Sequence, residues 1–293
     1  MRARHAATTA ALSLVIVVSA VGSSSAQISL VGEWTPRYHE DHPDRIPGPE
    51  PGDYTGLPLT PGARLAADTW NASRLTLPEH QCKVHISPYI YRGPNQLRIW
   101  EERDQFTKKL IAIKNYIDTY EQERTIWMDG RPHPPEWAPH TWMGFSTGRW
   151  EGDILVVTTT HIKQEWIRRN GVPNSDRSTM IEHFIRHGNI MSHLVQWTDP
   201  VYLTEPLLRS EEFVLNERPG GNWLWPCEYV DEIVDRSHSA VPNYLPGKSP
   251  FAGEFAKAHG IPIEAANGGA ETTYPEYQQK LKALMAAGKG ASK

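Results

Sequence analysis

The sequence predicts a mainly β protein, built as an antiparallel β-barrel of about ten strands with short C-terminal helices. Three observations lead to this fold class. The 293 residues include 24 prolines, which remove backbone donors and fix φ, so a helical bundle is disfavoured. Short runs rich in β-branched and aromatic residues recur between turn residues. No helix long enough for a parallel crossover separates them. A β-sandwich is the alternative arrangement of such strands.

The composition is that of a folded chain with its own core, because 39% of the residues are hydrophobic and 22% are charged. The net charge of −4 offers no basic surface for nucleic acid. A small-molecule ligand or substrate is therefore the expected partner. Beyond the N-terminus, no apolar run approaches the about 18–20 residues that span a bilayer, so we expect no transmembrane segment after signal cleavage.

Residues 1–26 are typical of a secretory signal. Arg2 and Arg4 form a basic start, an apolar stretch follows, and small residues precede a predicted cleavage site before Gln27. A membrane anchor is the alternative, but the apolar stretch is short for one. We therefore expect a periplasmic or secreted protein.

Two cysteines, Cys82 and Cys227, are the complete set in the chain. An even pair in an oxidising compartment predicts one disulfide. It would close a loop of 146 residues, counted from one cysteine to the other inclusive. A metal-binding or nucleophilic thiol is the alternative, which no Cys-x-x-Cys spacing supports.

The segment 27–80 is predicted to be an N-terminal arm with one short helix. It opens with a β candidate at 27–34 and continues through a stretch rich in Pro, Gly and Asp, which we expect to be irregular. Thr60 and Pro61 suit the N-cap and first position of a helix over 62–70.

The barrel domain is expected over 81–236, and a C-terminal extension over 237–293. Strands are predicted outside the hairpins at 84–91, 96–102, 110–117, 124–128, 207–215 and 223–230. The extension should carry two short helices, at 251–259 and 275–287, which dock on the barrel.

Two hairpins are the clearest elements of the predicted barrel. One spans 178–198 with Gly188-Asn189 as its two-residue turn. This register places Phe184 opposite His193. The other spans 148–160 and turns at its Gly-Asp pair.

Several segments resemble a widespread family of secreted bacterial proteins of uncharacterised function. They are Asp-Gly-Arg-x-His-Pro at 129–134, Trp-Met-Gly-x-Ser-x-Gly-Arg-Trp-Glu-Gly-Asp at 142–153, and further segments at 166–176, 199–206 and 274–277. The resemblance covers most of the chain after the signal. It implies secretion and assigns no reaction.

Separately, Gly32-Glu33-Trp34 is similar to the Gly-x-Trp that opens lipocalin-type barrels. In those barrels the tryptophan closes one end. The similarity therefore implies a lipocalin-like or calycin-like barrel.

Three residues are candidate catalytic groups: His133, His161 and Asp176. Each falls at a predicted strand end or in an adjoining loop, where side chains can gather at one barrel mouth. Two imidazoles with a carboxylate suit acid–base chemistry or a divalent metal. The cofactor is left open, with a divalent metal as one candidate. No His-x-His or His-Glu-x-x-His spacing is present, so no metal ligand is assigned.

Five residues are predicted to bind the ligand: Asp129, Arg131, Trp142, Trp150 and Glu182. The first two lie on the proline-stiffened loop of His133, and an arginine can clamp a carboxylate. Tryptophans stack on flat rings or sugar faces, and the alternative is that they fill the core.

Two functions follow from these features, and whether the chain is an enzyme is left open. The first is a secreted or periplasmic protein that binds a small apolar, aromatic or glycosidic ligand at the barrel mouth. The alternative is a periplasmic enzyme of hydrolase or lyase type, with or without a metal. A structural role in the envelope is a third reading. The chain lacks the glycine motifs of serine hydrolases, nucleotide-binding and dinucleotide-binding proteins.

Overall fold

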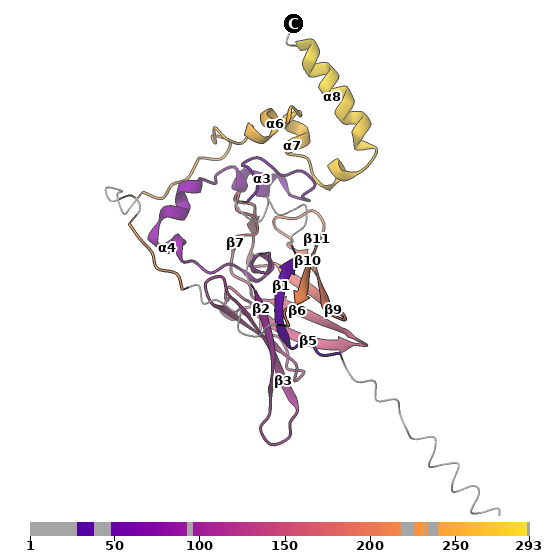
Figure 1. Ribbon diagram of the computed structural model, residues 1–293. Coiled ribbons are helices and arrows are strands. Elements are labelled where there is room, and N and C mark those ends of the chain that lie inside the picture. Colours follow the sequence, from indigo (N-terminus) through magenta and orange to yellow (C-terminus); the bar gives the residue numbers. More distant parts are fainter. Residues whose placement is uncertain are drawn as a thin grey trace, which may run out of the picture.

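A computed structural model describes residues 28–37, 48–92, 96–217, 226–231, 233 and 240–291. Its longer strands are β1 (Gly32–Arg37), β2 (Leu97–Arg103), β3 (Leu110–Ile117), β4 (Gln122–Trp127), β5 (Phe145–Glu151), β6 (Ile154–Thr160), β9 (Thr179–His187), β10 (Ile190–Thr198) and β11 (Leu207–Leu215). In these described ranges the nine strands close a barrel in the order β1-β11-β10-β9-β6-β5-β4-β3-β2 (Figure 1). The predicted barrel is confirmed, and the β-sandwich alternative is wrong.

Neighbouring barrel strands are antiparallel except for β4 and β5, which pair in parallel. Strand directions cannot alternate all the way round a ring with an odd number of strands, so nine strands require a parallel pair. The connection between β4 and β5, residues 128–144, is long enough for such a crossover. Because this connection runs outside the barrel wall, the Asp129–His133 loop lies against the outer face of the sheet.

Both predicted hairpins are confirmed. β9 and β10 pair with Phe184 opposite His193. β5 and β6 pair from Phe145 opposite Thr160 to Glu151 opposite Ile154. The alternation of side chains along these strands decides which residues face the interior.

The strand predicted over 84–91 is wrong, because its second half forms the short helix α5 (Ser87–Ile90). A proline lies in the first turn of this helix, where its fixed φ is favourable. The buried residues Ile90 and Tyr91 then pack with the barrel core. Residues 226–230 of the strand predicted over 223–230 are not in a strand. Its first three residues, like the predicted signal 1–26, lie outside the described residues.

The remaining elements are short. They are α3 (Pro61–Ala67), η1 (Ala72–Thr76), α4 (Pro78–Gln81), β7 (Glu165–Trp166), β8 (Pro173–Asn174), α6 (Glu254–His259), α7 (Ile263–Ala266), η2 (Ala270–Thr273) and α8 (Tyr277–Ala291). Thr60 caps α3 as predicted, since its hydroxyl accepts a hydrogen bond from the Ala63 amide at 3.2 Å. The C-terminal extension carries the two predicted helices, as α6 and α8, and also α7 and η2.

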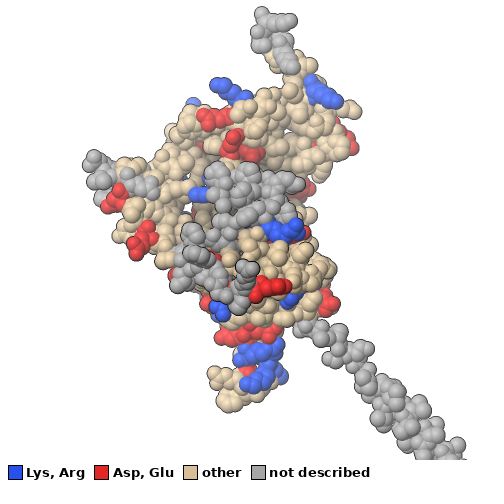
Figure 2. All heavy atoms as spheres, viewed as in Figure 1, with Lys and Arg blue, Asp and Glu red and all other residues tan. Residues whose placement is uncertain are grey.

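Helices α3, α4, α6 and α7 gather at one end of the barrel, and α8 projects away from the body (Figure 1). The β2–β3 hairpin extends from the other end, and Lys and Arg side chains gather near its tip (Figure 2). No helix in the described part of the chain is both long and apolar enough to cross a membrane.

The barrel takes its first strand, β1, from the segment that precedes the expected 81–236 domain. Trp34 in this strand is fully buried, and its indole Nε1 donates to the Leu30 carbonyl at 2.9 Å. The Arg186 guanidinium lies 5.2 Å from the centre of the Trp34 ring. The indole of the Gly-x-Trp segment therefore belongs to the barrel core.

Two hydrophobic clusters fill the described structure. One joins the helical cap to one end of the interior and includes Trp70, Trp166 and Trp197. The other occupies the remaining interior and includes Trp34 and Phe184. Because large side chains occupy both clusters, the tryptophans inside the barrel contribute mainly to packing.

The predicted disulfide is present between Cys82 and Cys227, whose Cα atoms are 5.5 Å apart. It joins the end of α4 to the segment after the last barrel strand. The Gln81 side chain reinforces this junction, because it both donates to and accepts from the backbone of Val230, at 2.8 Å each.

Candidate functional site

The three candidate catalytic residues, His133, His161 and Asp176, line one cleft of about 550 Å³ at the rim of the barrel. The cleft forms where β6 and β10 end and β9 begins. Its other lining residues are Pro134, Glu136, His140, Thr160, Arg177, Ser178, Thr179 and Pro200. The structure therefore brings together side chains from the β4–β5 connection, the end of β6, the start of β9 and the segment after β10.

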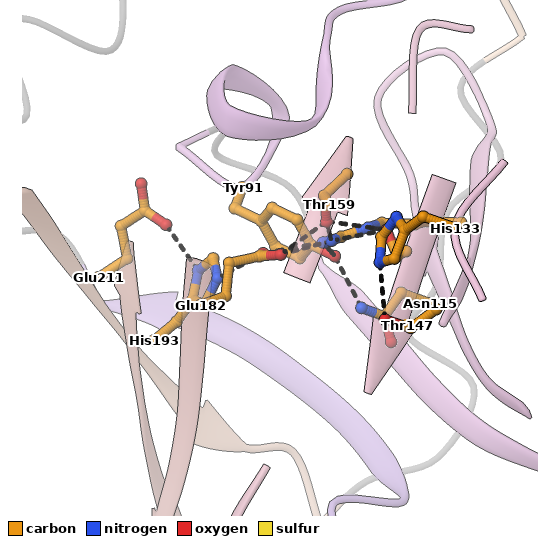
Figure 3. Close-up of polar contacts among 10 residues, drawn as sticks. Tyr91, Asn115, His133, Thr147, Thr159, Glu182, His193 and Glu211 are labelled. Atoms are coloured by element: carbon orange, nitrogen blue, oxygen red, sulfur yellow. Dashed lines mark hydrogen bonds and ion pairs between the residues drawn. The ribbon is translucent and has the colours of Figure 1, made fainter. Parts of the chain in front are cut away.

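Two threonine hydroxyls on the outer face of the barrel hold His133. Nδ1 of His133 lies 2.8 Å from Thr160 Oγ1. Its Nε2 lies 2.8 Å from Thr147 Oγ1 (Figure 3). The register of β5 and β6 places both threonines on the outer face, opposite in direction to the buried Ser146 and Thr159. The crossover between β4 and β5 therefore delivers His133 to this face.

His161 follows directly after β6 and is mostly buried. Its φ of +57° is in the left-handed region, which is uncommon for residues other than glycine. Its Nδ1 lies 2.7 Å from Thr160 Oγ1, and its Nε2 lies 3.0 Å from the Pro135 carbonyl oxygen. These two contacts hold the ring in place despite the unfavourable backbone conformation.

The Pro135 carbonyl only accepts, so His161 Nε2 donates to it. The Thr160 hydroxyl lies between the Nδ1 atoms of the two rings, and the Thr147 hydroxyl contacts His133 Nε2. Burial first and His161 second lower the pKa of His133, which keeps its ring neutral.

All four ring nitrogens of the two histidines therefore have partners within the protein. Neither ring offers a free nitrogen for proton abstraction or for a metal ion. In the same way, the described residues contain no group of three His, Cys, Asp or Glu side chains arranged to hold a metal. The histidines shape the wall of the cleft.

A buried carboxylate that sequence reasoning missed, Asp199, holds the rim loops together. It accepts from the Ser175 amide at 2.6 Å and hydroxyl at 2.8 Å, and from the amides of Val201 at 2.9 Å and Tyr202 at 3.2 Å. Asp176 is the exposed residue next to this clamp. The signal in the sequence was the Asp-Pro pair that ends a strand.

Asp129 and Arg131 lie on the His133 loop but do not line the cleft. Arg131 Nε donates to Asp129 Oδ1 at 2.9 Å, and its guanidinium stacks 3.4 Å from the centre of the Trp127 ring. Hydrogen bonds from Arg131 lower the pKa of Asp129. The charges of Asp129 and Arg131 therefore cancel each other on the outer face of the barrel.

Trp142 and Trp150 also lie away from the cleft lining. The ring of Trp142 has Lys83 Nζ at 4.9 Å and Lys163 Nζ at 4.6 Å, and it packs against the capping cluster. Trp150 packs against the interior cluster. The exposed tryptophan in this region is Trp137, which is 84% exposed and directly follows the cleft residue Glu136.

Glu182 lies inside the barrel in a network of buried polar groups (Figure 3). Arg124 pairs with both of its carboxylate oxygens, and the Arg124 Nη1–Glu182 Oε1 distance is 2.8 Å. Arg124 also donates to Tyr91, Ser146 and Thr159, at 2.9, 3.1 and 2.7 Å. The guanidinium of Arg124 in β4 therefore connects side chains from β5, β6 and β9 with Tyr91, which directly follows α5.

His193 extends this network from Glu182 to Glu211. Its Nε2 lies 2.9 Å from Glu182 and its Nδ1 3.1 Å from Glu211. Two carboxylates accept from one ring, so both nitrogens carry protons and the ring is an imidazolium. Burial acts to lower the pKa of His193, but the hydrogen bonds to both glutamates raise it above its ordinary value. The two cations and two carboxylates balance, which permits their burial between the two hydrophobic clusters.

The raised pKa of His193 predicts a stability that falls in mild alkali. Protonated His193 stabilises the fold fully below its ordinary pKa of 6.5, and this contribution is lost as pH rises through the higher folded pKa. Each unit between the two pKa values corresponds to about 1.4 kcal/mol. We expect the urea midpoint of the wild type to fall as the pH rises above 6.5, and His193→Gln to remove that part of the slope.

His187→Gln is the matched control, since His187 lies exposed beside the β9–β10 turn. It should leave the slope unchanged. A histidine with a lowered pKa, such as His133, affects stability only below pH 6.5, and there it makes the stability rise with pH. A His193→Gln protein with the same slope as the wild type would show that the ring is not charged.

Comparison of the chain with protein families, curated proteins and solved structures gives no match. The function must therefore be argued from the geometry of its own sites.

Proposed function

We propose that this protein is a secreted or periplasmic binding protein that holds a small glycosidic ligand in the rim cleft. The observation that carries the proposal is the exposed Trp137 beside a cleft rich in hydrogen-bonding groups. The flat face of this exposed indole suits the apolar face of a sugar ring.

The polar lining of the cleft supports a ligand with many hydroxyl groups. Asp176 and Glu136 supply acceptors, Arg177 supplies donors, and the hydroxyl of Thr179 can do both. Such convergent polar groups give a concave site its orientation and specificity. An apolar ligand would leave them without partners.

Binding fits the cleft better than catalysis, because the two histidines best placed for acid–base chemistry already use their ring nitrogens within the protein. The secreted location is supported by the Cys82–Cys227 disulfide, which is typical of oxidising compartments.

Calorimetric titration of the disulfide-bonded protein with methyl glucoside, cellobiose, maltose and chitobiose tests the proposal. We expect one of these sugars to bind. Trp137→Ala and Asp176→Asn should each weaken that binding by about 1–3 kcal/mol, from lost stacking and from an unpaired sugar hydroxyl.

Phe106→Ala is the matched control, because Phe106 is 91% exposed in the β2–β3 hairpin, far from the cleft. It should leave the affinity unchanged. No binding of any sugar, or equal affinities for wild type and Trp137→Ala, would refute the site. Release of free monosaccharide from a disaccharide during the titration would favour an enzyme instead.

A further inference from the structure

A second pocket, of about 260 Å³, lies beside the disulfide, where α4 meets the segment after the barrel. Its lining residues are Leu75, His80, Gln81, Lys83, Val84, His85, Tyr120, Glu165, Trp166, Arg169, Cys227, Glu228 and Val230. It shares no residue with the rim cleft, so the two sites can be tested separately.

Aromatic rings form one wall of this pocket. The His85 ring centre lies 5.2 Å from that of Trp166 and 5.4 Å from that of Tyr120. Trp166 is in turn fixed by edge-on contacts with Tyr89 at 5.1 Å and Trp70 at 5.5 Å. Such walls favour a flat aromatic ligand, which can add a further edge-on or offset contact.

Three polar groups of the lining have no polar partner among the residues that the structure describes. Within the described residues, no hydrogen bond or ion pair involves the His85 ring nitrogens, the Tyr120 hydroxyl or the Arg169 guanidinium. These atoms are not among the polar atoms that are fully buried without a partner, so a ligand in the pocket can reach them. Convergent unpaired polar groups in an otherwise aromatic pocket are typical of a binding site.

Among the charged side chains that line this pocket, Arg169 is the cation that can pair with a ligand. The Lys83 ammonium pairs with the Glu165 carboxylate. Burial first and the charge of Arg169 second lower the pKa of His85 to about 3, so its ring is neutral. Glu228 is exposed to solvent, which screens its charge. A ligand carboxylate would therefore meet one half-buried guanidinium.

The positions of His85 and Tyr120 are fixed by hydrogen bonds and by a turn. The Gln122 side chain accepts from the His85 amide at 3.2 Å and donates to its carbonyl at 2.7 Å. Tyr120 is held at a φ of +56°, in the left-handed region, and this turn places its ring beside His85. This conformation is unfavourable in free energy for a tyrosine, and such residues cluster at binding and active sites.

We propose that this pocket binds a small aromatic carboxylate. The ring lies against His85, Tyr120 and Trp166, and the carboxylate receives hydrogen bonds from Arg169. A cavity of about 150 Å³ holds a benzene ring, so the larger pocket has room for one substituted ring. An arginine fork matches a carboxylate in two parallel hydrogen bonds.

Calorimetric titration of the full disulfide-bonded chain with 4-hydroxybenzoate tests the proposal. A dissociation constant in the micromolar to low millimolar range is expected for a ligand of about ten non-hydrogen atoms. Cyclohexanecarboxylate keeps the charge but lacks the aromatic ring, and phenol keeps the ring but lacks the carboxylate. Each should bind at least about tenfold more weakly.

Arg169→Gln should weaken binding of 4-hydroxybenzoate at least about tenfold, since it removes a charged donor. Tyr120→Asn should also weaken it, and asparagine tolerates the left-handed backbone. Arg149→Gln, in the exposed β5–β6 hairpin, is the matched control and should bind as the wild type does. Thermal unfolding of each variant confirms that it is folded.

Three results would overturn the proposal: no binding of 4-hydroxybenzoate by the wild type, equal binding by folded Arg169→Gln, or equal binding of cyclohexanecarboxylate. Binding that survives Arg169→Gln but is lost in Trp137→Ala would assign the aromatic acid to the rim cleft instead.

Discussion

Replacing Arg124 by methionine should lower the free energy of unfolding by about 3–5 kcal/mol. Arg124 is 1% exposed and forms the paired contact with Glu182. Without the guanidinium, the buried Glu182 carboxylate keeps only His193 and a long hydrogen bond of 3.4 Å from the Thr159 hydroxyl. The Tyr91, Ser146 and Thr159 oxygens each lose a donor. Urea denaturation at neutral pH measures the loss as a lower midpoint.

A double-mutant cycle separates the ion pair from the packing of the arginine stem. Glu182→Gln alone should also destabilise the fold, but Arg124→Met with Glu182→Gln should cost less than the two changes summed, because no carboxylate is then left unpaired. Arg149→Met is the control, since the Arg149–Glu151 pair is largely exposed and such pairs contribute little. Additive losses in the cycle would show that Arg124 and Glu182 act independently.

Removing the disulfide should lower stability by up to about 5 kcal/mol, the chain-entropy value for a loop of this length. Cys82 and Cys227 are 145 positions apart, and the loop between them contains every barrel strand except β1. The crosslink therefore restricts nearly the whole barrel in the unfolded chain. Cys82→Ser with Cys227→Ser should show a lower denaturation midpoint than the wild type.

Reducing agent supplies an internal control for this prediction. It should shift the midpoint of the wild type toward that of the double serine variant and leave the variant itself unchanged. Equal midpoints for oxidised wild type and the variant would mean that the crosslink contributes only to the local junction at Gln81 and Val230.

The barrel hairpins could be predicted because their signals are local. Gly188 adopts a φ of +61° at the β9–β10 turn, a conformation that glycine favours. Once the turn is set, the two-residue period assigns Phe184 and His193 to one face. The strand predicted over 84–91 was wrong because a short run of β-branched and aromatic residues cannot be told from a short buried helix by pattern alone.

The candidate site could be predicted only in part. Loops at strand ends gather at a rim, so His133, His161 and Asp176 were expected near one another, and all three line the cleft. Glu182 was expected to meet a ligand, but it faces inward, and its partners come from distant strands. Its pairing depends on barrel closure, which brings together residues with no local relation in the sequence.

The sequence by itself determined the β class, the hairpin registers and the residues that face each side of a strand, because turns and alternation are local properties of the chain. It also predicted that the two cysteines would pair, since each is the only possible disulfide partner of the other. Only the tertiary structure decided that an odd number of strands closes the barrel, and hence that the β4–β5 crossover places His133 on the outer wall. The same closure decided that Arg124, Glu182, His193 and Glu211 form one neutral network, because charges can be buried only where the fold brings their partners within hydrogen-bonding distance.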